Sequence, residues 1–303
     1  MRKENYMNFH ESLESKVKEI ESILLKYLPK EEGPQKVVLE AMNYSVNAGG
    51  KRLRPMLMQE AFTLCGGKGE IVEPFMAALE MIHTYSLVHD DLPAMDNDEY
   101  RRGRKTTHVV YGETMAILAG DALLNFAFET ACKAFAMKPG CTEVEHAMMI
   151  LAKKAGIFGM IGGQTADILA ENSQSEVSKE QLLYIHENKT AALIQSALTI
   201  GAVLAGASKE DIQKLETVGY NVGVAFQIQD DVLDVIGTKE ELGKPIGSDE
   251  KNNKTTYVTL MGLEQSEAEV TRLSEEAIEL LASFEKRNEF LETLIRELIT
   301  RRK

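Results

Sequence analysis

Apolar residues recur along this chain at the spacing of an α-helix, from the first segment to the last. In residues 5–28 they stand three or four positions apart with charged residues between them, a period near 3.6 that places them on one helix face. These residues are Phe9, Leu13, Val17, Ile20, Leu24 and Leu28. No segment alternates like a strand and no Asn-Gly pair marks a hairpin, so the pattern predicts an all-α protein.

Prolines and glycines indicate where the expected helices begin and end. Gly49-Gly50 and Gly66-Gly67 are typical left-handed stops, and Pro74 suits the first turn of a helix. The later helices are expected at about residues 34–48, 55–66, 71–92, 112–136, 141–170, 178–205 and 208–236, with two or three shorter ones in 249–303.

Two helix starts carry capping residues. Ser178 with Gln181 resembles a capping box, and Ser208 with Asp211 is a looser version of it. No linker rich in Pro, Gly or Ser divides the chain, so we expect residues 1–303 to form one helical domain that can enclose a central cavity.

The expected helix from residue 71 ends in a dense group of carboxylates. An apolar helix leads into Asp90-Asp91, and Pro93 excludes the preceding residue from the α region and ends the helix. The paired carboxylates therefore lie at the negative end of the helix dipole, where a cation is favoured. Asp96, Asp98 and Glu99 add charge in the same loop. Oxygen ligands without cysteine are the ligands of Mg²⁺, which binds through carboxylates and substrate phosphates.

A second acidic group, Asp230-Asp231-Val232-Leu233-Asp234, follows a strongly apolar segment. Asp230 and Asp234 lie one helical turn apart, and their repulsion costs about 0.2–0.5 kcal/mol unless something neutralises it. A solvated helix face explains an isolated motif of this kind equally well. The apolar neighbours favour burial, and buried carboxylates need a partner. The likeness of 87–91 to 227–231 strengthens the hypothesis of a site.

Basic residues accompany both acidic groups. Lys51 and Arg54 follow a Gly-Gly pair, a geometry suited to anion binding at a helix start. Arg101-Arg102 follow the first acidic loop, and Lys244 and Lys254 follow the second. Each alone is more often an ordinary surface cation. Together they indicate a Mg²⁺-bound polyphosphate, with metal on one side and Lys or Arg on the other.

Three further segments place polar groups within apolar helices. His83 precedes Asp90 by seven residues and shares its helix face, although a satisfied core histidine is the commoner role. Residues 186–190, His-Glu-Asn-Lys-Thr, offer a cation and a hydroxyl in mid-helix, where an exposed lysine is the plain interpretation. Residues 162–167, Gly-Gly-Gln-Thr-Ala-Asp, indicate close packing or a polar site.

The composition of the chain argues against several classes of function. A net charge of -13 and a pI near 5.1 argue against bulk nucleic-acid binding and adhesion to an anionic membrane. Cys65, Cys132 and Cys141 form no C-x-x-C pair, which favours a reducing compartment and argues against structural zinc. We find no apolar signal-peptide region and no run of about 18 uncharged apolar residues, so we expect a cytoplasmic protein. Nucleotide-binding glycine loops and serine-hydrolase motifs are absent from the sequence.

These motifs together resemble those of the short-chain trans-prenyltransferases of the polyprenyl synthetase family. The matching segments are D-D-x-x-x-x-D at 90–96 followed by Arg101-Arg102-Gly103, F-Q-I-Q-D-D-V-L-D at 226–234, and G-K-R-L-R-P at 50–55. The match extends from about Asn43 to Tyr257, and two aspartate motifs in this order with these basic partners are highly specific. The bacterial members that make farnesyl diphosphate are the most similar.

The resemblance implies an isoprenoid-synthase helical bundle, usually a homodimer, with a cluster of three Mg²⁺ ions between the aspartate motifs. The main metal ligands would be Asp90, Asp96 and Asp230, with Asp91, Asp231 and Asp234 completing or orienting the ligand shells. The allylic diphosphate would be held by Arg101, Lys189, Lys244 and Lys254. The diphosphate of isopentenyl diphosphate would be held by Lys51, Arg54, His83 and Arg102, and Thr190 and Gln227 would line the place where the allylic cation forms. Catalysis would depend above all on Asp90, Asp91, Asp96, Arg101, Lys189, Asp230, Asp231 and Lys244.

The implied reaction is a Mg²⁺-dependent head-to-tail condensation. Isopentenyl diphosphate would react with dimethylallyl or geranyl diphosphate to give (2E,6E)-farnesyl diphosphate and pyrophosphate. Metal and cations stabilise the departing pyrophosphate, the isopentenyl double bond attacks the allylic cation, and pyrophosphate can take the proton. No side-chain nucleophile is required, and the sequence offers none.

Product length in this family depends on the residue five before the first aspartate, here Tyr85, which is followed by the small Ser86. Helix geometry places Tyr85 roughly 7.5 Å along the axis from Asp90, comparable to an isoprene unit or two. The aromatic ring predicts a farnesyl product, and geranyl or geranylgeranyl diphosphate are alternatives. Asn97 departs from the acidic run of many relatives but lies outside the ligand positions.

Other functions fit the sequence less well. A class I terpene cyclase of the same fold would carry an N/D-x-x-x-S/T-x-x-x-E pattern in place of the second D-D-x-x-D. A metal phosphohydrolase built on His89-Asp90 would need more histidines at ligand spacing than six scattered ones provide. A non-catalytic partner subunit would lack one aspartate motif, and both are intact here.

Overall fold

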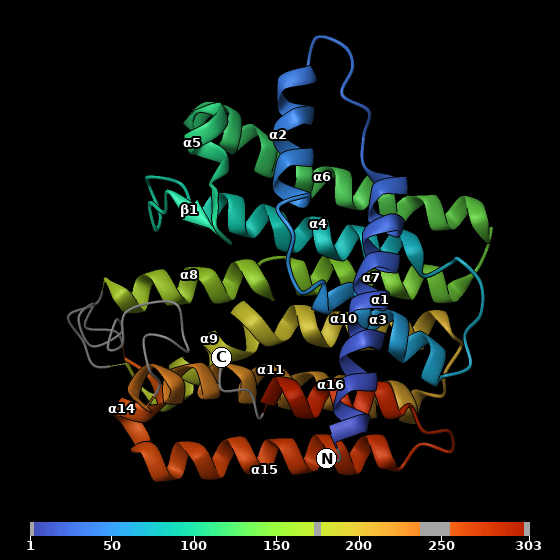
Figure 1. Ribbon diagram of the computed structural model, residues 1–303, viewed down its shortest axis with the longest axis vertical. Helices are drawn as coiled ribbons and strands as arrows, with labels where there is room; N and C mark the ends of the chain where they lie inside the picture. The colour runs from blue at the N-terminus through green and yellow to red at the C-terminus, as the bar shows by residue number, and fades with distance from the viewer. Residues whose placement is uncertain (1–2, 173–176, 237–254, 300–303) are drawn as a thin grey trace. The chain divides into compact units, whose positions relative to one another are not determined.

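The computed structural model describes residues 3–172, 177–236 and 255–299, with side chains from residue 9 onward, and nearly all of these residues are helical (Figure 1). The predicted all-α class is confirmed. Contacts group the chain into two compact units, residues 1–59 with 68–148 and residues 60–67 with 149–303. The helices α3 (Leu53–Leu64) and α7 (Thr142–Ala155) contribute residues to both.

The first unit is built around α4 (Glu73–Asp90), a helix whose residues are mostly buried. Its other helices are α1 (Lys3–Tyr27), α2 (Lys36–Val46), α5 (Thr107–Tyr111) and α6 (Glu113–Met137). α6 lies beside α4 and buries Gly120 and five alanines (Figure 1). A Cβ at Gly120 would lie 2.0 Å from Nε2 of His89, so this glycine lets α6 approach the last turn of α4 closely.

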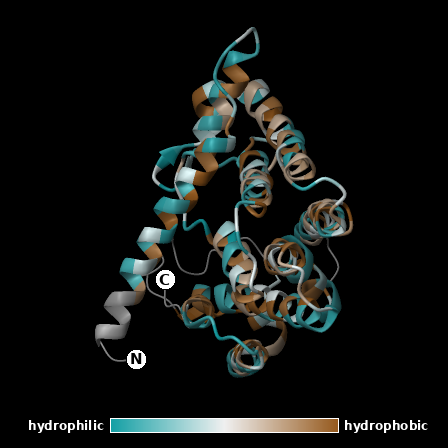
Figure 2. Cartoon of the chain, turned by 90° about the vertical axis from the view of Figure 1, so that its right-hand side faces the viewer, coloured by the Kyte–Doolittle hydropathy of each residue, from teal (hydrophilic) through white to brown (hydrophobic). Residues whose placement is uncertain are grey.

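The helical period of α1 is visible in its packing. Ile20 and Leu24 are buried, while the neighbouring charged residues Lys18, Glu19 and Lys26 are exposed. Figure 2 shows apolar and polar residues alternating along this helix. The amphipathic pattern therefore predicted both the helix and its buried face.

The second unit surrounds α10 (Ala192–Leu204), whose residues are buried along its whole length. Its other elements are α8 (Met160–Glu171), α9 (Lys179–Ile185), the π-helix η1 (His186–Ala191), α11 (Lys209–Ile236), α14 (Tyr257–Met261), α15 (Leu263–Ala282) and α16 (Glu289–Ile299). α11 packs against both α10 and α15 (Figure 1). A Cβ at Gly219 of α11 would lie 2.6 Å from Cα of Gln195, so glycine sets the close approach of α11 to α10.

Two expected helices are interrupted. The helix expected over residues 141–170 is wrong as a single element, because α7 ends at Ala155 and α8 begins at Met160. A Cβ at Gly159 would lie 2.1 Å from the carbonyl oxygen of Lys154, so the chain bends where only glycine fits. The helix expected over 178–205 begins with the predicted capping box, in which the Gln181 N–H donates to Ser178 Oγ at 3.3 Å. It then passes through η1 before continuing as α10.

A short hairpin follows the first acidic loop, although the sequence predicted none. β1 (Tyr100–Arg101) pairs with β2 (Arg104–Lys105) in antiparallel register. The connecting residues Arg102 and Gly103 have φ angles of 53° and 75°, as a two-residue type I′ turn requires. The signal was weak because arginine stands where Asn or Asp is usual and each strand has two residues.

Among the described residues, only α6 is long and apolar enough to cross a membrane by length and composition. Its most apolar window has a mean hydropathy of 1.3 and is 39% buried within the protein. A core helix of a soluble protein passes the same test, so one such helix is weak evidence for a membrane span.

Candidate functional site

The first acidic site consists of the end of α4 and the loop that follows it. The loop turns back so that the N–H of Asp96 donates to the carbonyl oxygen of Asp90 at 2.9 Å. Asn97 adopts a φ of 55° and donates to the carbonyl oxygen of Leu92 at 3.1 Å. The turn brings the first and last aspartates of the motif together at a helix C-terminus, where the dipole favours a cation.

The side chain of Asp91 is buried and forms an ion pair. Arg101 donates to Oδ1 of Asp91 from Nε at 2.8 Å and approaches the same oxygen with Nη2 at 2.6 Å. Burial raises the pKa of the Asp91 carboxyl, and the guanidinium of Arg101 partly offsets this effect. Arg101, which the resemblance assigns to the allylic diphosphate, is thus oriented by a carboxylate of the same motif.

Three arginines hold the turn that carries the exposed Lys51. Each donates to one backbone carbonyl: Arg52 to Val46 at 2.8 Å, Arg104 to Asn47 at 3.0 Å, and Arg102 to Gly49. Carbonyl groups at a helix C-terminus lack partners within the helix, and these side chains supply them. Gly50 beside the guanidinium of Arg102 has a φ of 135°, a conformation that residues with a Cβ rarely adopt, so glycine is needed at this position.

The most deeply buried charge of the first unit is the pair of Arg52 with Glu80. Both side chains are 3% exposed, and Nη1 of Arg52 lies 2.9 Å from Oε1 of Glu80. Arg52 has a φ of 47°, a conformation that residues with side chains rarely adopt. Sequence reasoning missed both residues, although a glutamate within the apolar stretch of α4 was the available signal.

His83 lies among arginines, as the resemblance requires for a diphosphate site. Burial lowers the pKa of His83 well below 6.5, and the positive charges of Arg54 and Arg102 lower it further. Burial also lowers the pKa of Arg54 to about 10, and Arg102 acts in the same direction. The buried Nε of Arg54 has no hydrogen-bond partner in the described part of the chain. An anion with several oxygens would relieve both the mutual repulsion and the missing bond.

Tyr85 is buried in the first unit, one helical turn before His89. Its side chain is 6% exposed, and burial followed by the charge of Asp90 raises its pKa to about 12. The ring packs edge-on against His89 with centroids 5.8 Å apart, and the hydroxyl lacks a hydrogen-bond partner among the residues described. The neighbouring Ser86 donates to the carbonyl oxygen of His83 at 2.9 Å. The ring therefore occupies space without a polar contact of its own.

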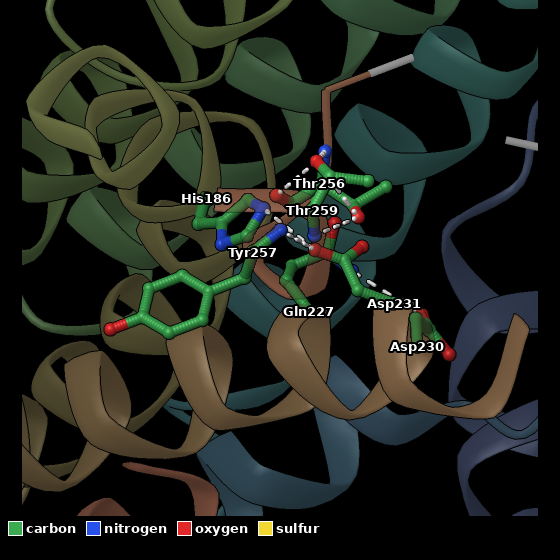
Figure 3. A network of polar contacts seen from close by, with 7 residues as sticks. All are labelled: His186, Gln227, Asp230, Asp231, Thr256, Tyr257 and Thr259. Atoms are coloured by element: carbon green, nitrogen blue, oxygen red, sulfur yellow. Dashed lines mark hydrogen bonds and ion pairs between the residues drawn. The ribbon is translucent and has the colours of Figure 1, made fainter. Parts of the chain in front are cut away.

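The second acidic site lies on α11. Gln227 donates weakly to Oδ2 of Asp230 at 3.4 Å, while Oδ2 of Asp231 accepts the backbone N–H of Tyr257 at 2.7 Å (Figure 3). Asp234 is buried. The three aspartates of this motif therefore have different surroundings, as those of the first motif do.

Lys189 lies on η1 and is oriented by α8. Its Nζ lies 2.5 Å from Oδ2 of the buried Asp167. A Cβ at Gly163 would lie 2.1 Å from the backbone nitrogen of Lys189, so α8 and η1 are in direct backbone contact. The close packing predicted for residues 162–167 is confirmed. Thr190, the next residue of η1, is half-buried.

Lys244 and Lys254 lie outside the described residues. Within the described ranges no three His, Cys, Asp or Glu side chains converge as a metal-binding group. The donors at both acidic sites are carboxylate oxygens, and the loop geometry already joins Asp90 to Asp96, so the residues fit Mg²⁺ completed by substrate phosphates.

Comparisons with known proteins agree with this geometry. A family described as polyprenyl synthetase matches residues 35–297. The chain is 45% identical over 266 residues to a geranylgeranyl diphosphate synthase of Cyanophora paradoxa, covering 88% of this chain and 87% of that one. It is 44% identical over 244 residues to a farnesyl diphosphate synthase of Geobacillus stearothermophilus, covering 80% and 81%. A geranyltransferase of Helicobacter pylori, solved with magnesium and isoprenyl diphosphate, has a TM-score of 0.78 at 33% identity, covering 95% of each chain.

Proposed function

The chain belongs to the polyprenyl synthetase family, a family of Mg²⁺-dependent trans-prenyltransferases, and we propose that it makes farnesyl diphosphate. Its substrates would be isopentenyl diphosphate and the allylic dimethylallyl and geranyl diphosphates. The observation that carries the proposal is the group of arginines around His83 beside the first aspartate motif, in which the buried Nε of Arg54 has no acceptor among the described residues.

The side chains would divide between two diphosphates. Lys51, Arg54, His83 and Arg102 would bind isopentenyl diphosphate, and Arg101, Lys189, Lys244 and Lys254 would bind the allylic diphosphate. Asp90, Asp96 and Asp230 would hold Mg²⁺, which when bound supplies charge neutralisation for departing pyrophosphate.

The proposed reaction requires the protein to bind two diphosphates and to place positive charge beside the departing pyrophosphate. It requires no side-chain nucleophile. The bond between C1 of the allylic substrate and its diphosphate oxygen would break, and the proposed roles of Arg101 and Lys189 are to stabilise the departing charge. The isopentenyl double bond then forms the new bond at C1, and the proton lost from isopentenyl C2 passes to pyrophosphate. Thr190 and Gln227, both with polar side-chain oxygens, would face the cation.

Tyr85 supports a C15 product. Its ring is buried on the α4 helix one and a half turns before Asp90, where a lengthening chain anchored at the aspartates would meet it. Relatives of similar identity carry the names of both C15 and C20 synthases, so the ring is the feature that favours the shorter product.

We also propose that two copies associate. The side chains of Ile117 and Leu118 on α6 are exposed, that of Leu118 to 44%. They belong to a helix that is long and apolar enough, by length and composition, to cross a membrane. Exposed large apolar residues favour a protein partner, and a second copy would cover them. Light scattering coupled to size-exclusion chromatography should give a mass near twice the 33.7 kDa of one chain, and a monomeric mass would contradict the pairing.

The deciding experiment is incubation with labelled isopentenyl diphosphate, each allylic diphosphate and Mg²⁺, followed by dephosphorylation and sizing of the alcohols. A dominant C15 alcohol that disappears with EDTA is expected. A C10 or C20 alcohol would keep the reaction and reject the product, and absence of condensation would reject the function.

A further inference from the structure

Asp230 and Asp231 are adjacent on α11, yet their carboxylates point in different directions. Consecutive residues of an α-helix are turned about 100° from one another. Figure 3 shows Asp231 directed toward the start of α14, whereas Asp230 points away from it. Neighbouring aspartates with such different orientations need not have one role.

The contact of Asp231 with α14 supplies a hydrogen-bond acceptor that the helix needs. Tyr257 is the first residue of α14, and its N–H donates to Oδ2 of Asp231 at 2.7 Å. The capping box of the same helix serves other groups: Thr259 N–H donates to Thr256 Oγ1 at 3.2 Å, and Thr256 N–H donates to Thr259 Oγ1 at 2.9 Å. Asp231 therefore completes the cap, and the 2% exposed side chain of Tyr257 is positioned with it.

The same carboxylate oxygen approaches a third element. Nε2 of His186 lies 3.9 Å from Oδ2 of Asp231, and His186 is a buried residue at the start of η1. η1 also carries Lys189, and it contacts α11 where a Cβ at Gly223 would lie 2.4 Å from Cα of Ala191. One oxygen of α11 thus lies at the beginnings of both α14 and η1 (Figure 3).

We propose that Asp231 is a positioning residue that joins α14 and η1 to α11, while the adjacent Asp230 has the metal-binding role. The proposal rests on the proposed function for Asp230 and on the contacts with Tyr257 and His186 for Asp231. A neutral backbone N–H requires an acceptor oxygen but not a negative charge, whereas a Mg²⁺ ligand at this position requires the charged carboxylate. Asparagine keeps an acceptor oxygen and removes the charge, so it separates the two roles.

The test compares Asp231→Asn, Asp231→Ala and Asp230→Asn with the unchanged enzyme. We measure kcat, the Mg²⁺ concentration for half-maximal activity, and the melting temperature. Asp231→Asn should lower kcat by only about threefold and leave the Mg²⁺ requirement unchanged, because a neutral acceptor forms a weaker bond than a carboxylate. Asp231→Ala should lower kcat by about tenfold or more and lower the melting temperature, because the Tyr257 N–H loses its acceptor. Asp230→Asn should lower kcat about a hundredfold and raise the Mg²⁺ requirement without lowering the melting temperature.

Two results would overturn the proposal. A loss in Asp231→Asn equal to that in Asp230→Asn, with a raised Mg²⁺ requirement, would make Asp231 a ligand. Wild-type melting and kcat in Asp231→Ala would show that the contact positions nothing. An unchanged enzyme without condensation activity would reject the proposed function alone, and the melting temperatures of the two Asp231 variants would still decide whether the contact with α14 holds.

Discussion

At the scale of single residues, positive charge and backbone strain coincide in the first unit. The described residues other than glycine with positive φ are Arg52, Asn97 and Arg102, all in the turn or loop beside the proposed site. Each such conformation costs on the order of 1–3 kcal/mol and persists only where the surroundings enforce it. Glu80 and the carbonyl of Val46 enforce that of Arg52. The backbone strain is therefore concentrated in the segments that position the side chains of the proposed diphosphate site.

Replacing Tyr85 with alanine should lengthen the product. The buried ring occupies the space below Asp90, and its removal leaves room for at least one further isoprene unit. Chromatography of the dephosphorylated alcohols should show products beyond C15. Tyr85→Phe is the matched control: the hydroxyl has no hydrogen-bond partner in the described structure, so the product should be unchanged. Identical products from all three enzymes would reject the ring as the limit.

Replacing Glu80 with glutamine should destabilise the protein by about 3 kcal/mol, because the buried guanidinium of Arg52 loses its nearest and only buried counter-charge among the described residues and keeps the more distant, exposed Glu21. Urea denaturation gives this value, and the KM for isopentenyl diphosphate should rise because the turn after α2 loosens. Glu40→Gln is the control, since Glu40 pairs with Lys36 at the surface, where such a pair contributes less than about 1 kcal/mol. Equal effects of the two substitutions would contradict the assigned role of the buried pair.

At the scale of elements, the sequence predicted helices well and their interruptions poorly. The capping box at Ser178 was predictable because it joins residues three positions apart. The π-helix η1 was not, because no residue type marks it and its geometry depends on packing against α8 and α11. Interruptions of this kind are frequent at functional sites, and here the interruption carries Lys189.

Gly163→Ala should displace η1 from α8. The added methyl group would lie 2.1 Å from the nitrogen of Lys189, so the backbone has to move and Lys189 leaves Asp167. We expect kcat to fall by about tenfold or more, because Lys189 would be misplaced in the site, and we expect a lower melting temperature. The exposed Thr165→Ala on the same helix should change neither quantity. Full activity of Gly163→Ala would show that the backbone contact is dispensable.

At the scale of the whole molecule, the motifs predicted the residue types of the site but not their partners. Asp91 with Arg101, Lys189 with Asp167 and Arg52 with Glu80 join residues 10, 22 and 28 positions apart. No helical period connects such positions, so only the fold reveals which charges meet. The predicted aspartates and cations of the first motif nevertheless lie in one unit, because α4 and the loops beside it carry them all.

Acid should weaken the fold through His83. Its pKa in the folded protein lies well below the ordinary 6.5, so below that pH the unfolded chain binds more protons and the free energy of unfolding falls. Each further pH unit costs up to about 1.4 kcal/mol until the folded pKa is reached, and nothing is lost above pH 7. Urea denaturation between pH 7 and 5 should show a smaller slope in His83→Gln than in the unchanged protein. His146→Gln, an exposed substitution, should retain the original slope, and equal slopes in all three would contradict the prediction.

The arginine contacts of the turn after α2 also have a kinetic consequence. Arg102 and Arg104 reach carbonyl groups 53 and 57 residues earlier in the chain. Contacts of such long sequence separation require a large loop to close before they form. We therefore expect this turn to become ordered late in refolding, after α2 and the hairpin exist, and to gain protection from amide hydrogen exchange only in the last kinetic phase. The protein would then acquire its helices before it acquires the ability to bind a diphosphate.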